Sequence, residues 1–200
     1  NRIKTRQQWL DQRKACEADL GAFHGQIASE TIHWFDHAQG PDGAWICYNA
    51  ETKSWSGWDA KTLAPVPLDL DDTYRPWKRD FVGDNAPLFK WFDGGLTNAC
   101  FNEVDRHVLA GYGDEAALIF EGDRWDSSLN QSRGGPVESY EVSRKKLLLE
   151  TAKCALVLKK LGLGLGDRIA SNMPNIPQQI FWIEAAKRLG ILYTPVFGGV

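Results

Sequence analysis

The clearest pattern of apolar and polar positions lies in the last third of the chain, from about residue 140 to residue 200. Between Val142 and Leu158 apolar residues recur at a near-helical spacing, with Lys, Arg and Glu between them. This pattern predicts a long helix that begins at residues 139–141. Gly162 and Gly164 are expected to end it, because glycine is common just past a helix C-terminus. Residues 167–172 then fit a short buried strand.

A second helix and a second strand follow at regular spacing. Pro177 suits the first turn of a helix that runs to Gly190, since proline is tolerated where no backbone donor is needed. Residues 191–197 are an apolar run typical of a strand, and residues 116–121 predict an earlier strand of the same sheet. Strands and helices that alternate in this way predict βαβ units, and therefore an α/β fold with a parallel sheet and flanking helices.

The patterns in the first half of the chain are shorter. Residues 5–20 predict a polar helix closed by Gly21, and residues 29–35 predict a second short helix with Ser29 as its N-cap. Residues 98–110 predict a third helix. These assignments rest on local spacing and on capping residues alone.

An aromatic-rich insert occupies residues 40–72. Aromatic residues alternate through residues 44–49 and 54–59 on either side of a polar turn, which predicts a β-hairpin. Residues 69–77 read as an irregular acidic loop with aromatic anchors. Two interpretations stay open: tryptophans that hold the insert onto its own core, or a contact surface for another domain.

Several short motifs follow one another along the second half of the chain: residues 90–98, 102–107, 117–123, 166–170, 173–177, 185–190 and 196–199. In this order they resemble the acetyl-CoA synthetase branch of the adenylate-forming, or AMP-binding, acyl-CoA synthetases. The resemblance covers roughly residues 87–200. It implies that residues 87–200 are the start of the large N-terminal domain, which continues beyond residue 200. Residues 1–86 are then a lead that carries the aromatic-rich insert.

The resemblance also implies an activity. Enzymes of this branch convert a short-chain carboxylate and ATP to an acyl-adenylate and pyrophosphate, and the thiol of coenzyme A then displaces AMP. ATP, Mg²⁺ and coenzyme A are therefore the expected cofactors, with Mg²⁺ neutralising the phosphate charge. No Gly-x-x-x-x-Gly-Lys and no Ser/Thr-rich phosphate loop occurs in the 200 residues. We therefore expect the fragment alone to be inactive and to contain no catalytic or metal-binding residue.

One binding motif of the branch can be carried over residue by residue. Phe197, Gly198 and Gly199 match the segment that contacts the nucleotide of coenzyme A in acetyl-CoA synthetases. They follow a predicted strand, and ligands of open α/β sheets bind beyond the carboxyl ends of the strands. Glycine lets a ligand approach the backbone, and an aromatic ring offers a stacking face. On spacing alone, a tight turn explains the same residues equally well.

Two narrower readings and one of another class accompany this assignment. The long lead resembles the ligase portion of propionyl-CoA synthase more than a plain acetyl-CoA synthetase. The residues at positions 171–173 and 193–195 do so as well. That multifunctional enzyme activates 3-hydroxypropionate and uses NADPH. A plain acetyl- or propionyl-CoA synthetase is the alternative. A non-catalytic docking module, with the hairpin as its contact surface, is the reading of another class.

Composition changes this picture little. The 200 residues are 43% hydrophobic and 24% charged with a net charge of −3, so no basic face points to nucleic acid or to a membrane. The four cysteines are scattered, which favours free thiols in a cytoplasmic enzyme. A small-molecule carboxylate and the remaining domains of the same polypeptide are the expected partners, and an oligomer is left open. The first residues lack the pattern of a signal peptide and indicate a fragment.

Two further motifs have plain structural explanations. His33 and His37 would lie one helical turn apart if this segment is a helix, but no third ligand follows, so packing or surface histidines are favoured over a metal site. Gly162, Gly164 and Gly166 imitate a dinucleotide loop, yet they follow a helix and precede a strand, whereas a phosphate loop follows a strand. A helix end and a turn are the better reading.

Overall fold

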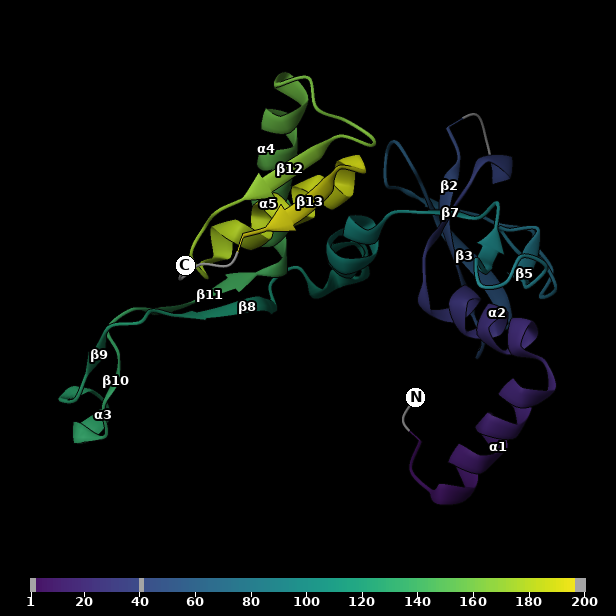
Figure 1. The fold of residues 1–200 in the computed structure, drawn as a ribbon, viewed down its shortest axis with the longest axis horizontal. Helices are drawn as coiled ribbons and strands as arrows, with labels where there is room; N and C mark the ends of the chain where they lie inside the picture. Colours follow the sequence, from purple (N-terminus) through teal and green to yellow (C-terminus); the bar gives the residue numbers. More distant parts are fainter. Residues whose placement is uncertain (1–2, 40–41, 197–200) are drawn as a thin grey trace. The chain divides into compact units, whose positions relative to one another are not determined.

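The computed structural model describes residues 3–39 and 42–196 and divides the chain into two compact units (Figure 1). The first unit is Asn1–Thr97 and the second is Asn98–Val200. Each unit has its own buried apolar clusters. The sequence predicts a different division, into a lead at residues 1–86 and the start of the large domain at residues 87–200. That division stays a prediction.

Two helices open the first unit. Helix α1 (Arg6–Ala18) begins with a capping box, in which the Thr5 hydroxyl accepts from the backbone N–H of Gln8 and the Gln8 side chain accepts in return. Helix α2 (Leu20–Thr31) begins because the Asp19 carboxylate accepts from the N–H of Ala22. The predicted helix end at Gly21 is therefore wrong. Ser29, predicted as an N-cap, lies buried inside α2.

A five-stranded antiparallel sheet follows, in the order β4-β3-β2-β1-β7. Its strands are β1 (Trp34–Asp36), β2 (Ala44–Asn49), β3 (Ser54–Asp59), β4 (Pro65–Val66) and β7 (Leu96–Thr97), with the 3₁₀ turn η1 (His37–Gln39) after β1. The predicted hairpin is confirmed with both strand boundaries, and Tyr48 lies opposite Trp55. The predicted helix over residues 29–35 is wrong at its second half, because β1 pairs with β2.

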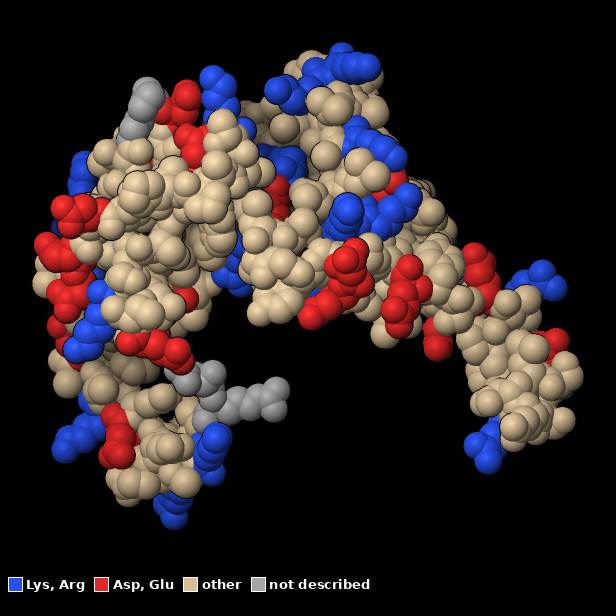
Figure 2. All heavy atoms as spheres, turned by 180° about the vertical axis from the view of Figure 1, so that it is seen from behind, with Lys and Arg blue, Asp and Glu red and all other residues tan. Residues whose placement is uncertain are grey.

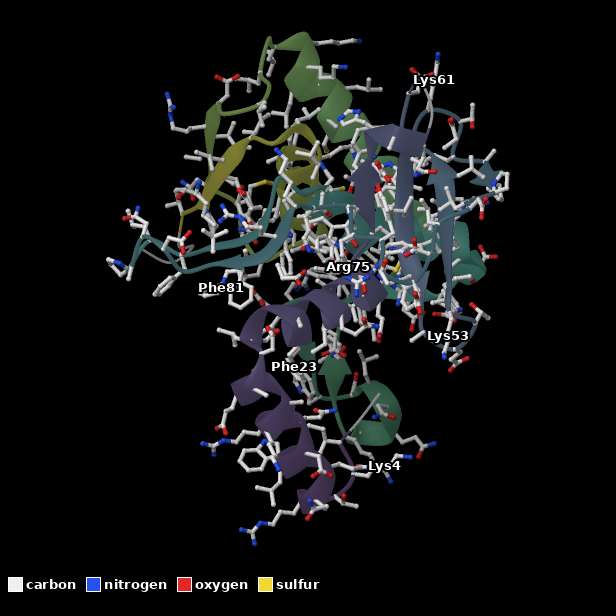
Figure 3. The ribbon with its side chains drawn as sticks, turned by 90° about the vertical axis from the view of Figure 1, so that its right-hand side faces the viewer. Lys4, Phe23, Lys53, Lys61, Arg75 and Phe81 are labelled. Atoms are coloured by element: carbon white, nitrogen blue, oxygen red, sulfur yellow. The ribbon has the colours of Figure 1, made fainter. Side chains whose placement is uncertain are left out.

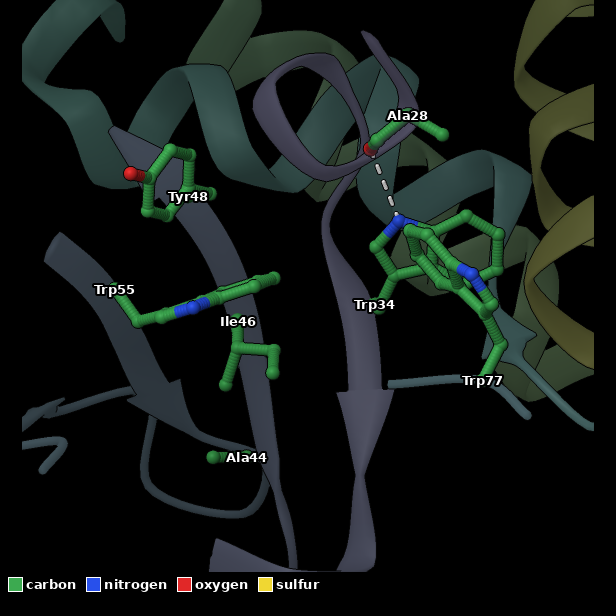
Figure 4. Close-up of a cluster of buried hydrophobic side chains, with 7 residues drawn as sticks. All are labelled: Ala28, Trp34, Ala44, Ile46, Tyr48, Trp55 and Trp77. Atoms are coloured by element: carbon green, nitrogen blue, oxygen red, sulfur yellow. Dashed lines mark hydrogen bonds between the residues drawn. The ribbon is translucent and has the colours of Figure 1, made fainter. Parts of the chain in front are cut away.

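The core of the first unit is built from α2 and this sheet (Figure 4). The indole of Trp34 donates to the backbone oxygen of Ala28 at 3.0 Å, and its ring lies 4.7 Å from that of Trp77. Trp55 is 5% exposed and donates to the backbone oxygen of Asp71 at 3.0 Å. These contacts favour the interpretation in which tryptophan holds the insert onto its own core.

The rest of the first unit is an irregular segment and a second hairpin. Residues 67–78 contain no helix or strand, as predicted for the acidic loop, and Arg75 donates to the Gln26 side chain of α2 at 3.1 Å (Figure 3). Strands β5 (Arg79–Val82) and β6 (Lys90–Asp93) form a separate antiparallel pair. In Figure 3, Lys53 and Lys61 mark the two ends of β3.

The second unit begins with helical turns and an antiparallel ribbon. The turns η2 (Phe101–Asp105) and η3 (Val108–Tyr112) are π-helical, so the third predicted helix is present in a wider form. Strand β8 (Ala116–Glu121) pairs with β11 (Ser139–Ser143). Between them lie β9 (Trp125–Asp126), the short helix α3 (Leu129–Ser132) and β10 (Gly135–Pro136).

The remainder of the second unit has the predicted alternation. Helix α4 (Arg144–Lys160), β12 (Arg168–Ser171), α5 (Pro177–Leu189) and β13 (Leu192–Pro195) follow in order, and β12 and β13 are parallel. Pro177 is the first residue of α5, and Gly190 ends it with a φ of 69°. This β12-α5-β13 unit, with α4 packed on α5, confirms the mixed α/β fold class.

One predicted helix boundary and one predicted strand pairing in the second unit are wrong. Residues 139–143 form β11 instead of the start of the long helix, and Ser143 caps α4 by accepting from the N–H of Lys146. Strand β8 does not join β12 and β13, because its hydrogen-bonding partner is β11. The glycine run after α4 is a turn, with φ of 81° at Gly162 and 85° at Gly166.

Candidate functional site

The carboxyl ends of β12 and β13 lie side by side. In the parallel register Ser171 pairs with Pro195, and the next residue, Val196, donates its N–H to the backbone oxygen of Ser171 at 2.8 Å. The two chains therefore leave the strands at one edge, where ligands of parallel sheets bind. Phe197, Gly198 and Gly199 come next in the sequence and lie outside the described residues. Their predicted contact with coenzyme A stays a prediction.

A groove lies at the carboxyl end of β12. It has a volume of about 400 Å³ and is lined by Phe120, Asp123 and residues 172–176. A short connection that contains Pro174 and the extended residue Ile176 joins β12 to α5. This connection lies beside the end of β8, and both line the groove. The groove therefore has walls from the β8 end and from the β12-α5 connection.

The walls of this groove differ in chemistry. Phe120, Met173, Pro174 and Ile176 are apolar, whereas Asp123, Asn172 and Asn175 present polar side chains. None of these three polar side chains makes a hydrogen bond within residues 3–39 and 42–196. All three are exposed to solvent. A second hollow of about 250 Å³ shares Phe120, Asn175 and Ile176 and extends along β8 to the first turn of α5. Apolar walls with a few polar groups are typical of small-molecule sites.

A cluster of ion pairs lies at the other end of α5. Arg188 donates through its two terminal nitrogens to the two carboxylate oxygens of Asp105, at 3.1 and 2.5 Å. Lys187 lies 2.6 Å from Glu103 and 2.7 Å from Glu184. Burial raises the pKa of Asp105, and the Arg188 guanidinium offsets part of that rise. The cluster ties η2 to α5.

Asn98 and Cys100 complete this connection. The Asn98 amide donates to the backbone oxygens of Lys187 and Arg188, and its own oxygen accepts from the N–H of Phe101. One side chain thereby satisfies the end of α5 and the start of η2. Cys100 is fully buried beside Asp105, and burial raises the pKa of its thiol to about 12. A buried thiol with a raised pKa is a poor nucleophile, so these residues position α5 and carry no reaction.

The histidine pair of the sequence is not on a helix. Strand β1 lies between His33 and His37, so the assumed helical spacing is wrong. His33 stacks on Trp58 with ring centres 5.0 Å apart, and His37 meets the edge of Phe35 at 4.4 Å. Across the part of the chain that the structure describes, no group of three or more His, Cys, Asp or Glu residues could hold a metal ion.

The groove residues were not singled out from the sequence as a site. In the sequence, residues 173–177 and residues 117–123 stand out only as motifs of the resemblance. A usable signal was present, because Asn172 directly follows a predicted strand, where ligand-binding side chains of α/β sheets gather. That Asp123 faces the same groove follows only from the fold of the β8-β11 ribbon, since the two residues are far apart in the sequence.

The surface and the helices add two observations. On the face shown in Figure 2, Lys and Arg are interspersed with Asp and Glu. Among the helices of the described residues, none combines the length and the apolar character that crossing a membrane requires.

By sequence the chain is similar to acetyl-coenzyme A and acyl-CoA synthetases. It is 34% identical to an acetyl-coenzyme A synthetase of Campylobacter jejuni over 155 residues, which are 77% of this chain and 21% of the relative. An acetyl-coenzyme A synthetase of Rhodopirellula baltica is 39% identical over 113 residues, 56% of this chain and 16% of its own. The mitochondrial acyl-CoA synthetase short-chain family member 3 of Mus musculus is 34% identical over 126 residues, 63% and 17% of the two chains.

The remaining comparisons add little to this. No family model matches the chain. The solved structure of acetoacetyl-CoA synthetase from Streptomyces lividans aligns with a TM-score of 0.49 and 25% identity, over 60% of this chain and 17% of that one. The chain spans about a fifth of the length of the curated relatives it matches. Over most of its own length it is related to the acetyl-CoA synthetases and short-chain acyl-CoA synthetases, a branch of the AMP-binding acyl-CoA synthetase family.

Proposed function

We propose that this chain is the N-terminal part of an ATP-dependent, AMP-forming ligase that joins a short-chain carboxylate to coenzyme A. The observation that carries the proposal is the sequence relation over 155 residues to an acetyl-coenzyme A synthetase. In this proposal the chain supplies the first βαβ unit of the large domain and one edge of its ligand site. A cytoplasmic location, suggested by four free cysteines, belongs to the same proposal.

The described residues that line the groove do not suit the phosphate groups of ATP. The groove at the end of β12 is lined by a carboxylate and two carboxamides, and phosphates are held by cations and backbone N–H groups instead. We therefore propose that ATP and Mg²⁺ bind to other parts of the whole enzyme. Mg²⁺ would neutralise the charge that develops on the phosphates. The edge formed by β12 and β13 would receive the coenzyme A nucleotide.

The first test is acid-dependent exchange between ATP and pyrophosphate in the whole enzyme. Exchange that requires acetate, propionate or a similar small acid supports the proposal, and the product of the complete reaction is the matching acyl-coenzyme A. The isolated 200 residues should show no exchange. If the whole enzyme shows no exchange with any small carboxylate, the proposal fails.

The second test separates the two half-reactions at Phe197, Gly198 and Gly199. Gly198→Val adds a branched side chain where the proposal brings backbone close to the nucleotide, so KM for coenzyme A should rise. ATP-pyrophosphate exchange uses no coenzyme A and should survive. Phe197→Ala should have the same effect more mildly, by about 1–3 kcal/mol if a base stacks there. A fall in both half-reactions together would indicate a structural role only.

A narrower proposal is that the whole enzyme is propionyl-CoA synthase. It is supported by the residues at the ends of β12 and β13, Ser171–Met173 and Tyr193–Pro195 as written in the sequence, and by the aromatic-rich lead. Its reaction would activate 3-hydroxypropionate, remove water from the thioester, and reduce the resulting double bond with NADPH. The test is NADPH oxidation that depends on 3-hydroxypropionate, ATP and coenzyme A together. Acyl-coenzyme A formation without NADPH oxidation would leave a plain synthetase.

A further inference from the structure

A thiol and an imidazole meet in the first unit, where α1 contacts α2. The Sγ atom of Cys16 lies 3.9 Å from Nε2 of His24, and both side chains are half-buried. The imidazole ring also makes edge-to-face contacts with Phe23 at 5.3 Å and with Trp91 at 5.1 Å between ring centres. These contacts hold the ring with one nitrogen toward the thiol. A thiol with a base at this position is a candidate nucleophile, because the thiolate reacts and histidine can take up a proton near neutral pH.

The same imidazole forms one wall of an apolar hollow between α2 and β6. The hollow has a volume of about 300 Å³, and its other walls are Ile27, Ala28, Thr31, Ile32, Trp91 and Phe92. Ile27 and Trp91 are 42% and 41% exposed although both are apolar, so the hollow is open to solvent. Among the described residues, neither lysine nor arginine lines it. Apolar walls without a cation suit an uncharged apolar chain and not a phosphate or a carboxylate.

We propose that Cys16 is an acyl-accepting thiol, modified by acyl thioesters whose apolar chain lies in the hollow beside His24. The Cys16 sulfur attacks the thioester carbonyl, so a bond forms between that carbon and Sγ, and the bond to the departing sulfur breaks. His24 takes the proton of Cys16 and returns it to the departing thiolate. One thioester replaces another, so the step needs neither an oxidant nor a reductant. This inference goes beyond the proposed function and does not rest on it, because any acyl thioester can be the donor.

The surroundings of Cys16 differ from those of the other three cysteines. Helix α1 buries none of its residues, so a donor in solution can approach the thiol. The Cys47 thiol donates to backbone oxygens at the end of α2, at 3.4 and 3.5 Å. Cys100 is fully buried. Cys154 is half-buried like Cys16, but burial raises the pKa of its thiol, which makes Cys154 the matched comparison.

The experiment uses the whole enzyme and two donors that carry no nucleotide, so a coenzyme A site is not involved. The N-acetylcysteamine thioesters of acetate and of hexanoate are incubated with the enzyme at neutral pH, and acylated peptides are followed by mass spectrometry. We expect Cys16 to be acylated roughly tenfold faster than Cys154. Hexanoyl should be transferred to Cys16 roughly tenfold faster than acetyl, because its additional methylene groups leave water in the hollow.

Two variants assign the effect to residues. His24→Phe keeps an aromatic ring in place but removes both nitrogens, and it should slow acylation of Cys16 by on the order of a hundredfold with both donors. Ile27→Ser should abolish the preference for hexanoyl and leave the acetyl rate unchanged. The matched controls are His37→Phe, at a histidine that also meets an aromatic edge, and Leu20→Ser, at a residue of α2 that is 40% exposed and outside the hollow. Hydrogen exchange in peptides from α2 checks that each variant keeps its fold.

The outcomes separate this site from a merely exposed cysteine. Equal acylation of Cys16 and Cys154, equal rates for the two donors, or an unchanged rate in a folded His24→Phe variant overturns the proposal. Oxidation of Cys16 by hydrogen peroxide without acylation by either donor overturns it as well. If His24→Phe does not fold, the unaltered enzyme decides through its two cysteines and two donors. Acylation with the expected pattern supports the site even if acid-dependent exchange is absent, which would overturn only the proposed function.

Discussion

Removal of the Arg188 guanidinium tests whether the cluster at the end of α5 stabilises the second unit. The two terminal nitrogens of Arg188 bind both carboxylate oxygens of Asp105, whose side chain is 6% exposed. In Arg188→Ala the Asp105 carboxylate would lose the cation that offsets its charge in a place that water barely reaches. Breaking a buried pair in this way costs about 3–5 kcal/mol. We expect about 3 kcal/mol, because Arg188 itself is 27% exposed and solvent screens part of the interaction.

The pH dependence of this loss has a definite sign. Burial raises the pKa of Asp105 above the ordinary value of 3.8, and Arg188 offsets part of the rise. A carboxyl with a raised pKa in the folded chain binds its proton more tightly there than in the unfolded chain. Its stabilising effect is therefore present below the unfolded pKa and is lost as pH rises through the folded pKa. Without Arg188 the folded pKa rises further, so the deficit of the variant should be smallest at acidic pH, where both proteins hold the proton, and should grow as pH rises through the folded pKa of Asp105.

The assay is unfolding in urea, monitored by hydrogen exchange in peptides from η2 and α5. These peptides report the unfolding of the second unit separately from that of the first. The matched control is Arg13→Ala. Arg13 pairs with Glu17 along α1, but the two side chains are 60% and 62% exposed, so the loss should be about 0.5 kcal/mol or less. Equal losses in the two variants, or a deficit for Arg188→Ala that does not change with pH, would refute the reasoning.

Three other predictions test the packing inside each unit. Trp55→Ala removes a buried indole and should lower the free energy of unfolding by about 3–5 kcal/mol, measured by urea with exchange in β2 and β3; no loss would contradict a clamping role. Gly190→Ala should cost about 1–2 kcal/mol, because φ is 69° and the added Cβ would lie 2.5 Å from Leu165 Cδ1; an unchanged urea midpoint would argue against it. Iodoacetamide at about pH 8 should modify the half-buried Cys16 and spare the fully buried Cys100 until urea is added. The reason is that only the thiolate reacts, and burial raises the pKa of Cys100 to about 12. Mass spectrometry that shows both cysteines labelled in the native protein would contradict this.

The elements that the sequence predicted well are those whose signals are local. Helix α5 has proline at its first position and Gly190 at its end, and both act within one turn of the backbone. The β2-β3 hairpin has strands of six residues each, with aromatic residues alternating across a four-residue polar turn. In these cases the side chains that decide the structure are sequence neighbours, so the pattern alone contains enough information.

The elements that were missed depend on contacts between distant residues. Strand β1 has three residues, and it exists because Trp34 pairs with Ile46 on one side and Thr97 on the other. Strand β11 carries Val142 at a spacing that also fits the helix after it, but pairing with β8 decides in favour of a strand. Gly21 looks like a helix end because glycine weakens helices, yet the Asp19 cap starts a new helix before it.

One part of the candidate site could also be predicted from the sequence, and the other part could not. The carboxyl ends of the parallel strands follow from the order of elements, and Asn172 could be placed there from the sequence. Asp123 could not, because its position depends on how the β8-β11 ribbon lies against the loop before α5 within the second unit. A site assembled from two segments that are about fifty residues apart needs the fold before its members can be recognised.

The charged motifs at residues 102–107 and 185–190 show what a resemblance of this kind can support. Glu103 and Asp105 bind Lys187 and Arg188, so two motifs that are far apart in the sequence form one contact network in space. Loss of Arg188 would leave the Asp105 carboxylate, which is 6% exposed, without its cation, which is a reason for these two residues to occur together whatever reaction the protein performs. The similarity at these motifs therefore argues for shared packing of α5 against η2. The chemistry concerns the carboxyl edge of β12 and β13, where the two half-reactions test it directly.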